Sequence, residues 1–141
     1  MNSEVLTVRP GREGDLPAVA EIQAASPEAA QWNVRDYLDY EFTVACRGDE
    51  VAGFAVWRGL ADCEIELLNL AVKPSMRRKG VARTLLFLLT ASHGQSVWLE
   101  VRDSNLAARN LYKKLGFLEV TRRPEYYGSS GEGAIVMKFH S

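Results

Sequence analysis

Hydrophobic and polar positions follow the period of a β-strand through much of the chain. Segments in which apolar residues alternate with polar ones, or run together between turn residues, are 5–9, 42–47, 50–58, 64–72, 96–101, 117–122 and 134–139. Gly48 and Asp49 separate two of these segments by the length of a tight hairpin. Pro74 ends the fourth segment, because proline cannot continue a paired strand. The pattern therefore predicts a chain built mainly on strands.

Other segments repeat their apolar residues with helical spacing. The predicted helices are 15–25, 33–40, 81–93 and 105–115. Asp15 and Pro17 suit the start of the first helix, and Gly94 and Gly116 suit the ends of the last two. The resulting order predicts a fold of the α/β (α+β) class, with a mixed, mostly antiparallel sheet flanked by helices. We expect residues 1–141 to form a single domain.

The composition narrows the class of protein. The chain has 141 residues, of which 47% are hydrophobic and 25% charged, and its net charge is -1. These values are typical of a globular domain and favour neither a nucleic-acid platform nor a membrane-binding patch. The first residues lack the apolar stretch of a signal peptide, and no segment reaches transmembrane length. With only two cysteines, we expect a cytoplasmic protein with reduced thiols.

Positive charge gathers in the turn between the fourth strand and the third helix. The cations in and beside this turn are Lys73, Arg77, Arg78, Lys79 and Arg83. A glycine followed by small residues and a helix start would present free N–H groups and a positive dipole end. The turn is therefore a candidate anion site, most naturally for a pyrophosphate. The plainer interpretation is a solvated helix end, and the spacing matches neither a Walker loop nor a dinucleotide fingerprint.

The motifs in this half of the chain resemble a known family. The segment RRKGVA, residues 77–82, resembles the acetyl-CoA motif Gln/Arg-x-x-Gly-x-Gly/Ala of the GCN5-related N-acetyltransferases (GNAT). The segment NLAARNLYKKLGF, residues 105–117, is similar to a second motif of that superfamily. A narrower match, from WLEVRDSN to RRPEYYGSSGEGAIVM, resembles the ribosomal-protein-alanine N-acetyltransferases, the RimI group. The resemblance is strong from about residue 64 to residue 139 and general before that.

The resemblance implies direct acetyl transfer from acetyl-CoA, as co-substrate and without a metal, to an amine. It implies a cofactor site made by Leu70, Ala71, Val72, Arg77, Arg78, Lys79, Gly80, Val81, Ala82, Arg83 and Asn105. A backbone N–H at the end of the strand 64–72 would polarise the thioester carbonyl. The residues agree independently, since the sequence suggests no Ser-His-Asp or Cys-His constellation and no metal-ligand spacing.

Glu100 is the candidate general base. Alternation in SVWLEVR, residues 96–102, places Trp98, Glu100 and Arg102 on one side of the strand. The resemblance implies that Glu100 takes a proton from the incoming ammonium, directly or through water. Glu64 and Glu66 on the preceding strand are rival bases, and a solvent-facing glutamate is the plainer interpretation.

Asn105 and Tyr112 lie seven residues apart, two helical turns, so both belong to one stripe of the last helix. The resemblance implies that Tyr112 is the general acid that protonates the departing CoA thiolate, and that Asn105 contacts the pantetheine arm. The plainer interpretations are a core aromatic for Tyr112 and an N-terminal cap for Asn105.

Trp32, Tyr126 and Tyr127 are the candidate acceptor-binding residues, again by resemblance. The predicted partner is a peptide or the N-terminus of a ribosomal protein, most naturally its N-terminal alanine, with no nucleic-acid or membrane partner. The sequence leaves the oligomeric state open, with a monomer favoured. It also leaves two alternatives: the same chemistry on a small amine, an amino acid or a protein lysine, and a non-catalytic acyl-CoA-binding module.

Overall fold

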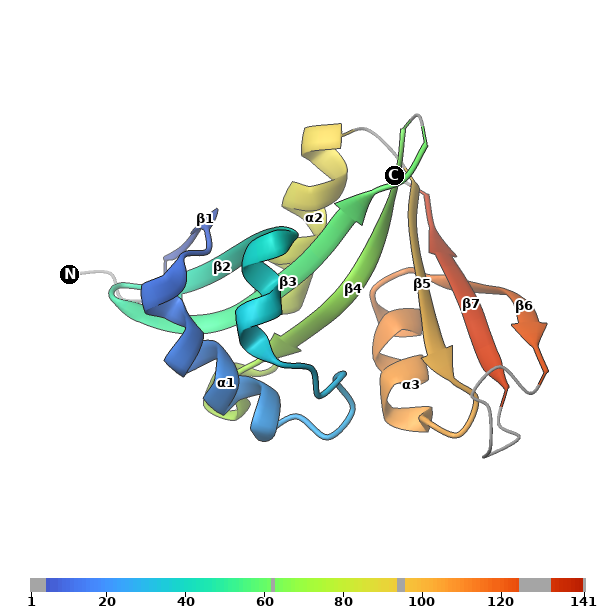
Figure 1. Cartoon of the computed structure of the whole chain (residues 1–141), viewed down its shortest axis with the longest axis horizontal. Helices are drawn as coiled ribbons and strands as arrows, with labels where there is room; N and C mark the ends of the chain where they lie inside the picture. Colours follow the sequence, from blue (N-terminus) through green and yellow to red (C-terminus); the bar gives the residue numbers. More distant parts are fainter. Residues whose placement is uncertain (1–4, 62, 94–95, 125–132, 141) are drawn as a thin grey trace.

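A seven-stranded sheet forms the centre of the molecule in the computed structural model, which describes residues 5–61, 63–93, 96–124 and 133–140. The strands are β1 (Leu6–Pro10), β2 (Glu41–Arg47), β3 (Glu50–Gly59), β4 (Glu64–Val72), β5 (Ser96–Arg102), β6 (Leu118–Arg123) and β7 (Ala134–Phe139). Their order across the sheet is β1-β2-β3-β4-β5-β7-β6 (Figure 1). The predicted fold class is confirmed, and the predicted strands agree with these bounds to within a residue or two.

The two halves of the sheet join at β4 and β5, which form its parallel pair. The other neighbouring strands are antiparallel. Pairing between β4 and β5 covers residues 64–66 of one strand and 96–98 of the other, after which the strands separate. Figure 1 shows them diverging like the arms of a V from their paired end. Backbone groups beyond residue 66 of β4 are therefore left facing an open wedge.

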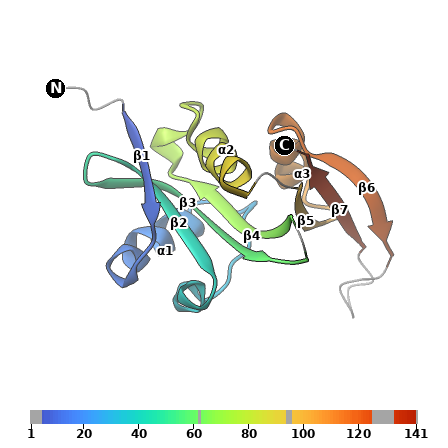
Figure 2. The ribbon, with the colours of Figure 1, turned by 90° about the horizontal axis from the view of Figure 1, so that it is seen from above.

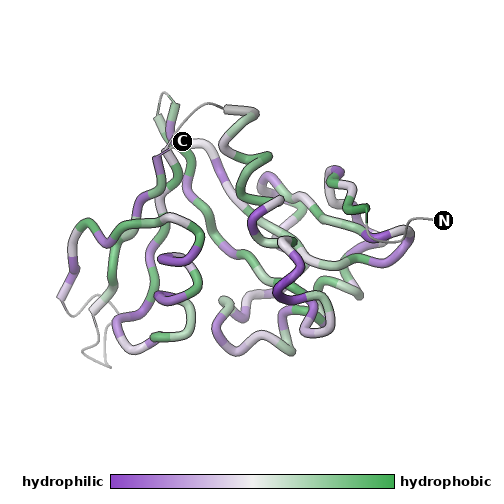
Figure 3. Tube along the Cα trace, turned by 180° about the vertical axis from the view of Figure 1, so that it is seen from behind, coloured by the Kyte–Doolittle hydropathy of each residue, from purple (hydrophilic) through white to green (hydrophobic). Residues whose placement is uncertain are grey.

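Helices cover both faces of the sheet. On one face lie α1 (Leu16–Ala24) and the 3-10 helices η1 (Glu13–Asp15) and η2 (Val34–Asp39), and on the other α2 (Val81–His93) and α3 (Leu106–Lys114), with η3 (Pro74–Met76) before α2 (Figure 2). Each face packs its own cluster of buried apolar side chains, and hydrophobic positions recur along the central strands and α2 (Figure 3). Within the described residues, no helix is long and apolar enough to cross a membrane.

The second predicted helix, residues 33–40, is a shorter 3-10 helix. Asn33 caps it by accepting the backbone N–H of Arg35, and Tyr37 is its buried side chain. Leu38 is exposed, so the segment lacks the apolar stripe at i and i+4 that stabilises an α-helix by packing. The predicted helix is therefore confirmed in position, and the structure shows that it is of the 3-10 type.

A β-bulge interrupts the pairing of β4 with β3. Val56 pairs with Asn69 and Trp57 with Leu67, so Leu68 has no residue opposite it. Because one extra residue reverses the alternation of a strand, Leu68 and Asn69 both face the side of α1 and η2. Leu70 then returns to the side of α2 and α3.

An ion pair fixes the start of α1 to β1. The Arg9 guanidinium donates two hydrogen bonds to the buried Asp15 carboxylate, at 2.7 and 2.8 Å, and the Arg12 N–H adds a third at 3.0 Å. The hydrogen bonds from Arg9 lower the pKa of Asp15 below its ordinary value. A carboxylate with a lowered pKa stabilises the fold above its unfolded pKa of about 3.9, and this contribution is lost as pH falls through the folded value.

We therefore expect Asp15→Asn to lower the free energy of unfolding by about 2 kcal/mol near neutral pH. This is less than the roughly 3–5 kcal/mol for breaking a fully buried pair, because the Arg9 side chain is 31% exposed. Urea unfolding measured from about pH 7 to about pH 2 tests it. The difference between variant and parent should shrink at low pH, and a difference that stays constant would contradict the assignment.

Candidate active site

The first pocket lies against the turn that precedes α2, and we call it the turn pocket. Its volume is about 490 Å³. Residues predicted to bind the cofactor that line it are Leu70, Ala71, Val72, Arg77, Arg78, Gly80, Val81, Ala82 and Arg83. Lining residues that the sequence did not single out include Glu28, Met76, Leu111 and Lys114. Lys79 and Asn105, also predicted, are not among the lining residues of this pocket.

The backbone of the turn is shaped to expose N–H groups. Arg78 and Gly80 both have positive φ, 64° and 81°, and Gly80 is the residue type that adopts this conformation without strain. The N–H of Thr84 donates to the Gly80 carbonyl at 2.9 Å, which closes the first turn of α2. The N–H groups at the start of the helix have no intrahelical acceptors, and the helix dipole favours an anion there. Arg83 and Lys114 add positive charge.

Arg77 is a cation of the turn that the protein itself engages, as Lys73 is by its ion pair with Glu50. Its guanidinium donates to Ser26 Oγ at 3.0 Å and lies 3.5 Å from the Glu28 carboxylate. Its Nε donates to the Val72 carbonyl at 3.2 Å. Arg77 thus connects the turn to the segment after α1, so the anion site depends mainly on the backbone N–H groups and the remaining cations.

The end of β4 presents a backbone donor to the wedge. The N–H of Lys73 donates to Ala52 of β3, so the groups of the preceding residue, Val72, point away from β3. The hydrogen bond from Arg77 to the Val72 carbonyl agrees with this direction. Because the N–H and C=O of one strand residue point to the same side, the Val72 N–H faces the open edge of β4. The resemblance led us to expect a backbone donor at this strand end, and its contact with the thioester carbonyl stays a prediction.

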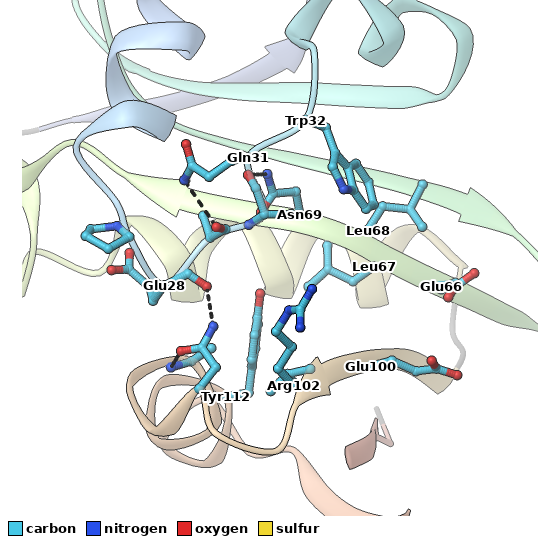
Figure 4. Close-up of a pocket in the computed structure, with 16 residues that line it drawn as sticks. Glu28, Gln31, Trp32, Glu66, Leu67, Leu68, Asn69, Glu100, Arg102 and Tyr112 are labelled. Carbon is cyan, nitrogen blue, oxygen red and sulfur yellow. Dashed lines mark hydrogen bonds between the residues drawn. The ribbon is translucent and has the colours of Figure 1, made fainter. Parts of the chain in front are cut away.

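The second pocket fills the wedge between β4 and β5, and we call it the wedge pocket. Its volume is about 590 Å³ (Figure 4). Its walls are residues 27–32, the middle of β4, the end of β5 and α3. Trp32, Glu100 and Tyr112, three of the predicted site residues, line it together. Tyr126 and Tyr127 lie outside the described residues. Glu28 lines both pockets, so the two adjoin.

Two candidate bases face the wedge pocket. Glu100 and Glu66 both line it, and Figure 4 shows them toward the same end. Glu100 has one carboxylate oxygen 3.2 Å from the Arg123 guanidinium, and Glu66 accepts from Arg58 at 2.8 Å. Glu64, the third candidate, accepts from the Trp98 indole at 3.1 Å and is not among the lining residues. The structure therefore narrows the choice to Glu100 and Glu66.

Tyr112 rises from α3 into the wedge pocket. Its ring is buried and packs edge-on against Phe117, with centroids 5.4 Å apart. Figure 4 shows its hydroxyl directed into the cavity toward β4. Burial, with a smaller contribution from the Glu28 charge, raises the pKa of Tyr112 above its ordinary value. The phenol therefore stays protonated near neutral pH and can serve as a proton donor.

Asn105 shares the wedge pocket with Tyr112, as their spacing on one stripe predicted. Its Oδ1 accepts the Ala108 N–H at 3.1 Å, which makes it the N-cap of α3. Its Nδ2 donates to the Glu28 carbonyl at 3.0 Å. These contacts match the capping interpretation, and the expected contact with pantetheine stays a prediction.

Arg102 and Asn69 are wedge-pocket residues that the sequence reasoning passed over. The alternation in β5 had already placed Arg102 on the same side of the strand as Glu100, so the sequence contained a signal that could have identified Arg102. Nothing local in the sequence marks Asn69, because its direction depends on the bulge at Leu68.

The fold and the two pockets together define an acyl-transferring enzyme, with an anion cradle on one side of β4 and carboxylates and a protonated phenol on the other. The sequence pattern of the acetyltransferase (GNAT) family matches residues 15–117. The chain belongs to this family and is an N-acetyltransferase. The resemblance read from the motifs is confirmed.

Known relatives agree in sequence and in structure. The chain is 36% identical over 137 residues to the [ribosomal protein bS18]-alanine N-acetyltransferase of Escherichia coli K12, covering 87% of this chain and 89% of the relative. The crystal structure of the ribosomal-protein-S18-alanine N-acetyltransferase from Escherichia coli superposes with a TM-score of 0.74 and 33% identity, covering 96% and 93%. A putative streptothricin acetyltransferase from Bacillus anthracis, solved with acetyl coenzyme A, shares the fold with a TM-score of 0.78 at 18% identity, covering 97% and 99%.

Proposed function

We propose that this chain is an acetyl-CoA-dependent N-terminal acetyltransferase, and that its acceptor is the N-terminal alanine of ribosomal protein bS18. The observation that carries the proposal is the identity with the Escherichia coli bS18-alanine enzyme, which extends over most of both chains. The site supports it, because an open wedge beside β4 has room for the end of an extended peptide.

The turn pocket fits the phosphate-bearing end of acetyl-CoA. The backbone N–H groups of residues 80–83, with Arg78, Arg83 and Lys114, would hold the pyrophosphate. The pantetheine arm would follow the open edge of β4, and the Val72 N–H is available to a carbonyl there. Bound in this way, acetyl-CoA supplies an activated acetyl group at the boundary between the two pockets.

The wedge pocket supplies the proton transfers. Glu100 accepts a proton from the incoming ammonium, directly or through water, and the freed amine attacks the thioester carbonyl. The C–N bond forms as the C–S bond breaks, Tyr112 donates its phenolic proton to the departing thiolate, and the proton that the acylated nitrogen releases returns Tyr112 to its neutral form. A peptide α-amine, with a pKa of about 8, gives up its proton more readily than a lysine side chain at about 10.4. A carboxylate base therefore favours the α-amine.

A substitution in the turn pocket can distinguish an effect on cofactor binding from an effect on the stability of the fold. An alanine at position 80 either keeps the positive φ, which costs roughly 1 kcal/mol, or relaxes it and turns the neighbouring N–H groups away from the anion. We expect Gly80→Ala to raise the KM for acetyl-CoA about tenfold and to leave the KM for the acceptor unchanged. Initial rates with each substrate varied in turn measure both.

Gly48→Ala is the matched control. Gly48 lies in the hairpin between β2 and β3, also has positive φ, and like Gly80 has open space around an added Cβ. It should lose similar stability with no change in the KM for acetyl-CoA. Equal KM values for acetyl-CoA in the two variants would show that the turn does not hold the cofactor.

Release of CoA thiol tests the function itself. The assay supplies acetyl-CoA with a short peptide beginning with alanine, and the control peptide has a blocked N-terminus and an internal lysine. We expect turnover with the free N-terminus alone. Turnover with the blocked peptide or with free small amines would assign a different acceptor. Binding of acetyl-CoA without turnover on any amine would support a non-catalytic module.

A further inference from the structure

A buried polar network lies behind the wedge pocket. It consists of Gln23 from α1, Tyr37 from η2 and Asn69 from β4, and all three side chains are buried. Asn69 Nδ2 lies 2.9 Å from the Tyr37 hydroxyl and 3.2 Å from Gln23 Oε1, and the Tyr37 hydroxyl donates to the same Gln23 oxygen. Buried polar groups of this kind destabilise a fold unless their hydrogen bonds are made.

The network ends on the backbone of the segment that borders the wedge pocket. We call this segment the lip, residues 27–32, all of which line the pocket. Asn69 accepts the N–H of Ala30 at 3.1 Å and donates to its carbonyl at 3.0 Å, so one side chain satisfies both backbone groups (Figure 4). Gln23 Nε2 donates to the Trp32 carbonyl at 2.7 Å.

The lip needs these contacts because it has no helix or strand to hold its backbone. Asn69 attaches the lip to the sheet directly, and Asn69 faces the lip because of the bulge at Leu68. Asn69 also accepts the N–H of Leu70 at 3.0 Å, which joins the lip to the open edge of β4. This network ends on one wall of the site.

We infer that Gln23, Tyr37 and Asn69 are positioning residues that hold the lip in the geometry that binds the acceptor. The inference rests on the proposed function, because it takes the wedge pocket to be the place where the acceptor binds. The three side chains act mainly through the lip backbone, and none of them is among the lining residues of the turn pocket. Loosening them should weaken acceptor binding and leave acetyl-CoA binding intact.

Tyr37→Phe removes one buried hydroxyl and keeps the ring. Thr90→Val is its matched control, because the buried Thr90 hydroxyl donates only within α2, to Leu86 and Phe87. We expect Tyr37→Phe to raise the KM for the acceptor peptide about tenfold, because the variant loses the hydroxyl that links Gln23 and Asn69. The KM for acetyl-CoA should change less than about twofold, and Thr90→Val should change neither constant.

Hydrogen exchange of the lip provides a readout that is independent of the acceptor. Amides of residues 27–32, followed by mass spectrometry, should exchange about tenfold faster in Tyr37→Phe than in Thr90→Val. Gln23→Met, which removes the bond to the Trp32 carbonyl, should give the same result if Tyr37→Phe folds poorly. Unchanged lip exchange, or faster exchange with an unchanged acceptor KM, would overturn the inference. If the parent enzyme did not acetylate the peptide, that result would refute the proposed function but not the positioning role. Hydrogen exchange of the lip would still decide the positioning role.

Discussion

Glu100→Gln is expected to lower kcat by roughly 10²–10⁴, the usual contribution of a general base. The substitution keeps the size of the side chain and removes the group that takes the ammonium proton. Glu100 lines the wedge pocket from β5, on the opposite side of the strand from the buried Leu99 and Val101. The ion pair of Glu100 with Arg123 lies between partly exposed side chains, so the fold should tolerate the change. Steady-state kinetics with saturating acetyl-CoA and acceptor measure the effect.

Glu66→Gln is the matched control, because it removes the other candidate base from the same pocket. Glu66 lines the same pocket and is also paired with an arginine, Arg58, so the two variants lose equivalent charges. We expect Glu66→Gln to change kcat by less than about tenfold. A large loss in Glu66→Gln with a nearly active Glu100→Gln would move the base from β5 to β4.

Tyr112→Phe is expected to lower kcat by roughly 10²-fold or more, with the KM for acetyl-CoA nearly unchanged. Only the phenolic proton is lost, because the phenylalanine ring can keep the edge-on contact with Phe117. The buried phenol, whose pKa is raised, stays protonated across the neutral range, so the defect should not depend on pH there.

Thermal unfolding provides the control for Tyr112→Phe. The variant should unfold within a few degrees of the parent, because the hydroxyl faces the cavity and the ring remains packed (Figure 4). An unchanged kcat would return Tyr112 to the role of a core aromatic. A lower kcat accompanied by a large loss of stability would indicate a packing effect.

Local features of the fold could be predicted from the sequence. Each strand carries its own alternation, and the turn before α2 has a glycine that occupies a positive φ, as its position suggested. The helix start and the cations beside it follow directly in the chain, so the anion site needs no long-range information. The alternation in β5 likewise placed Glu100 opposite the buried valines.

The rest depends on contacts between distant segments. Arg77 belongs to the motif, yet it bonds Ser26, which lies far from it in the sequence. Asn69 turns toward the lip because a bulge reverses the alternation of β4, and no local pattern marks that position. The resemblance alone favoured Glu100 over Glu66 as the general base, and the structure places both side chains in the same pocket. Tertiary packing decides the first two of these cases, and the kinetics of the two glutamine variants decide the third.

The most direct test of the central claim uses unacetylated ribosomal protein bS18 as the acceptor. The protein is incubated with acetyl-CoA and this enzyme, and fragmentation mass spectrometry then locates the added acetyl group. Our account predicts a single acetyl group on the α-amine of the N-terminal alanine, and none when Glu100→Gln replaces the parent over the same period. Acetyl groups on lysine side chains, or an unmodified bS18 beside clear turnover on another amine, would contradict it.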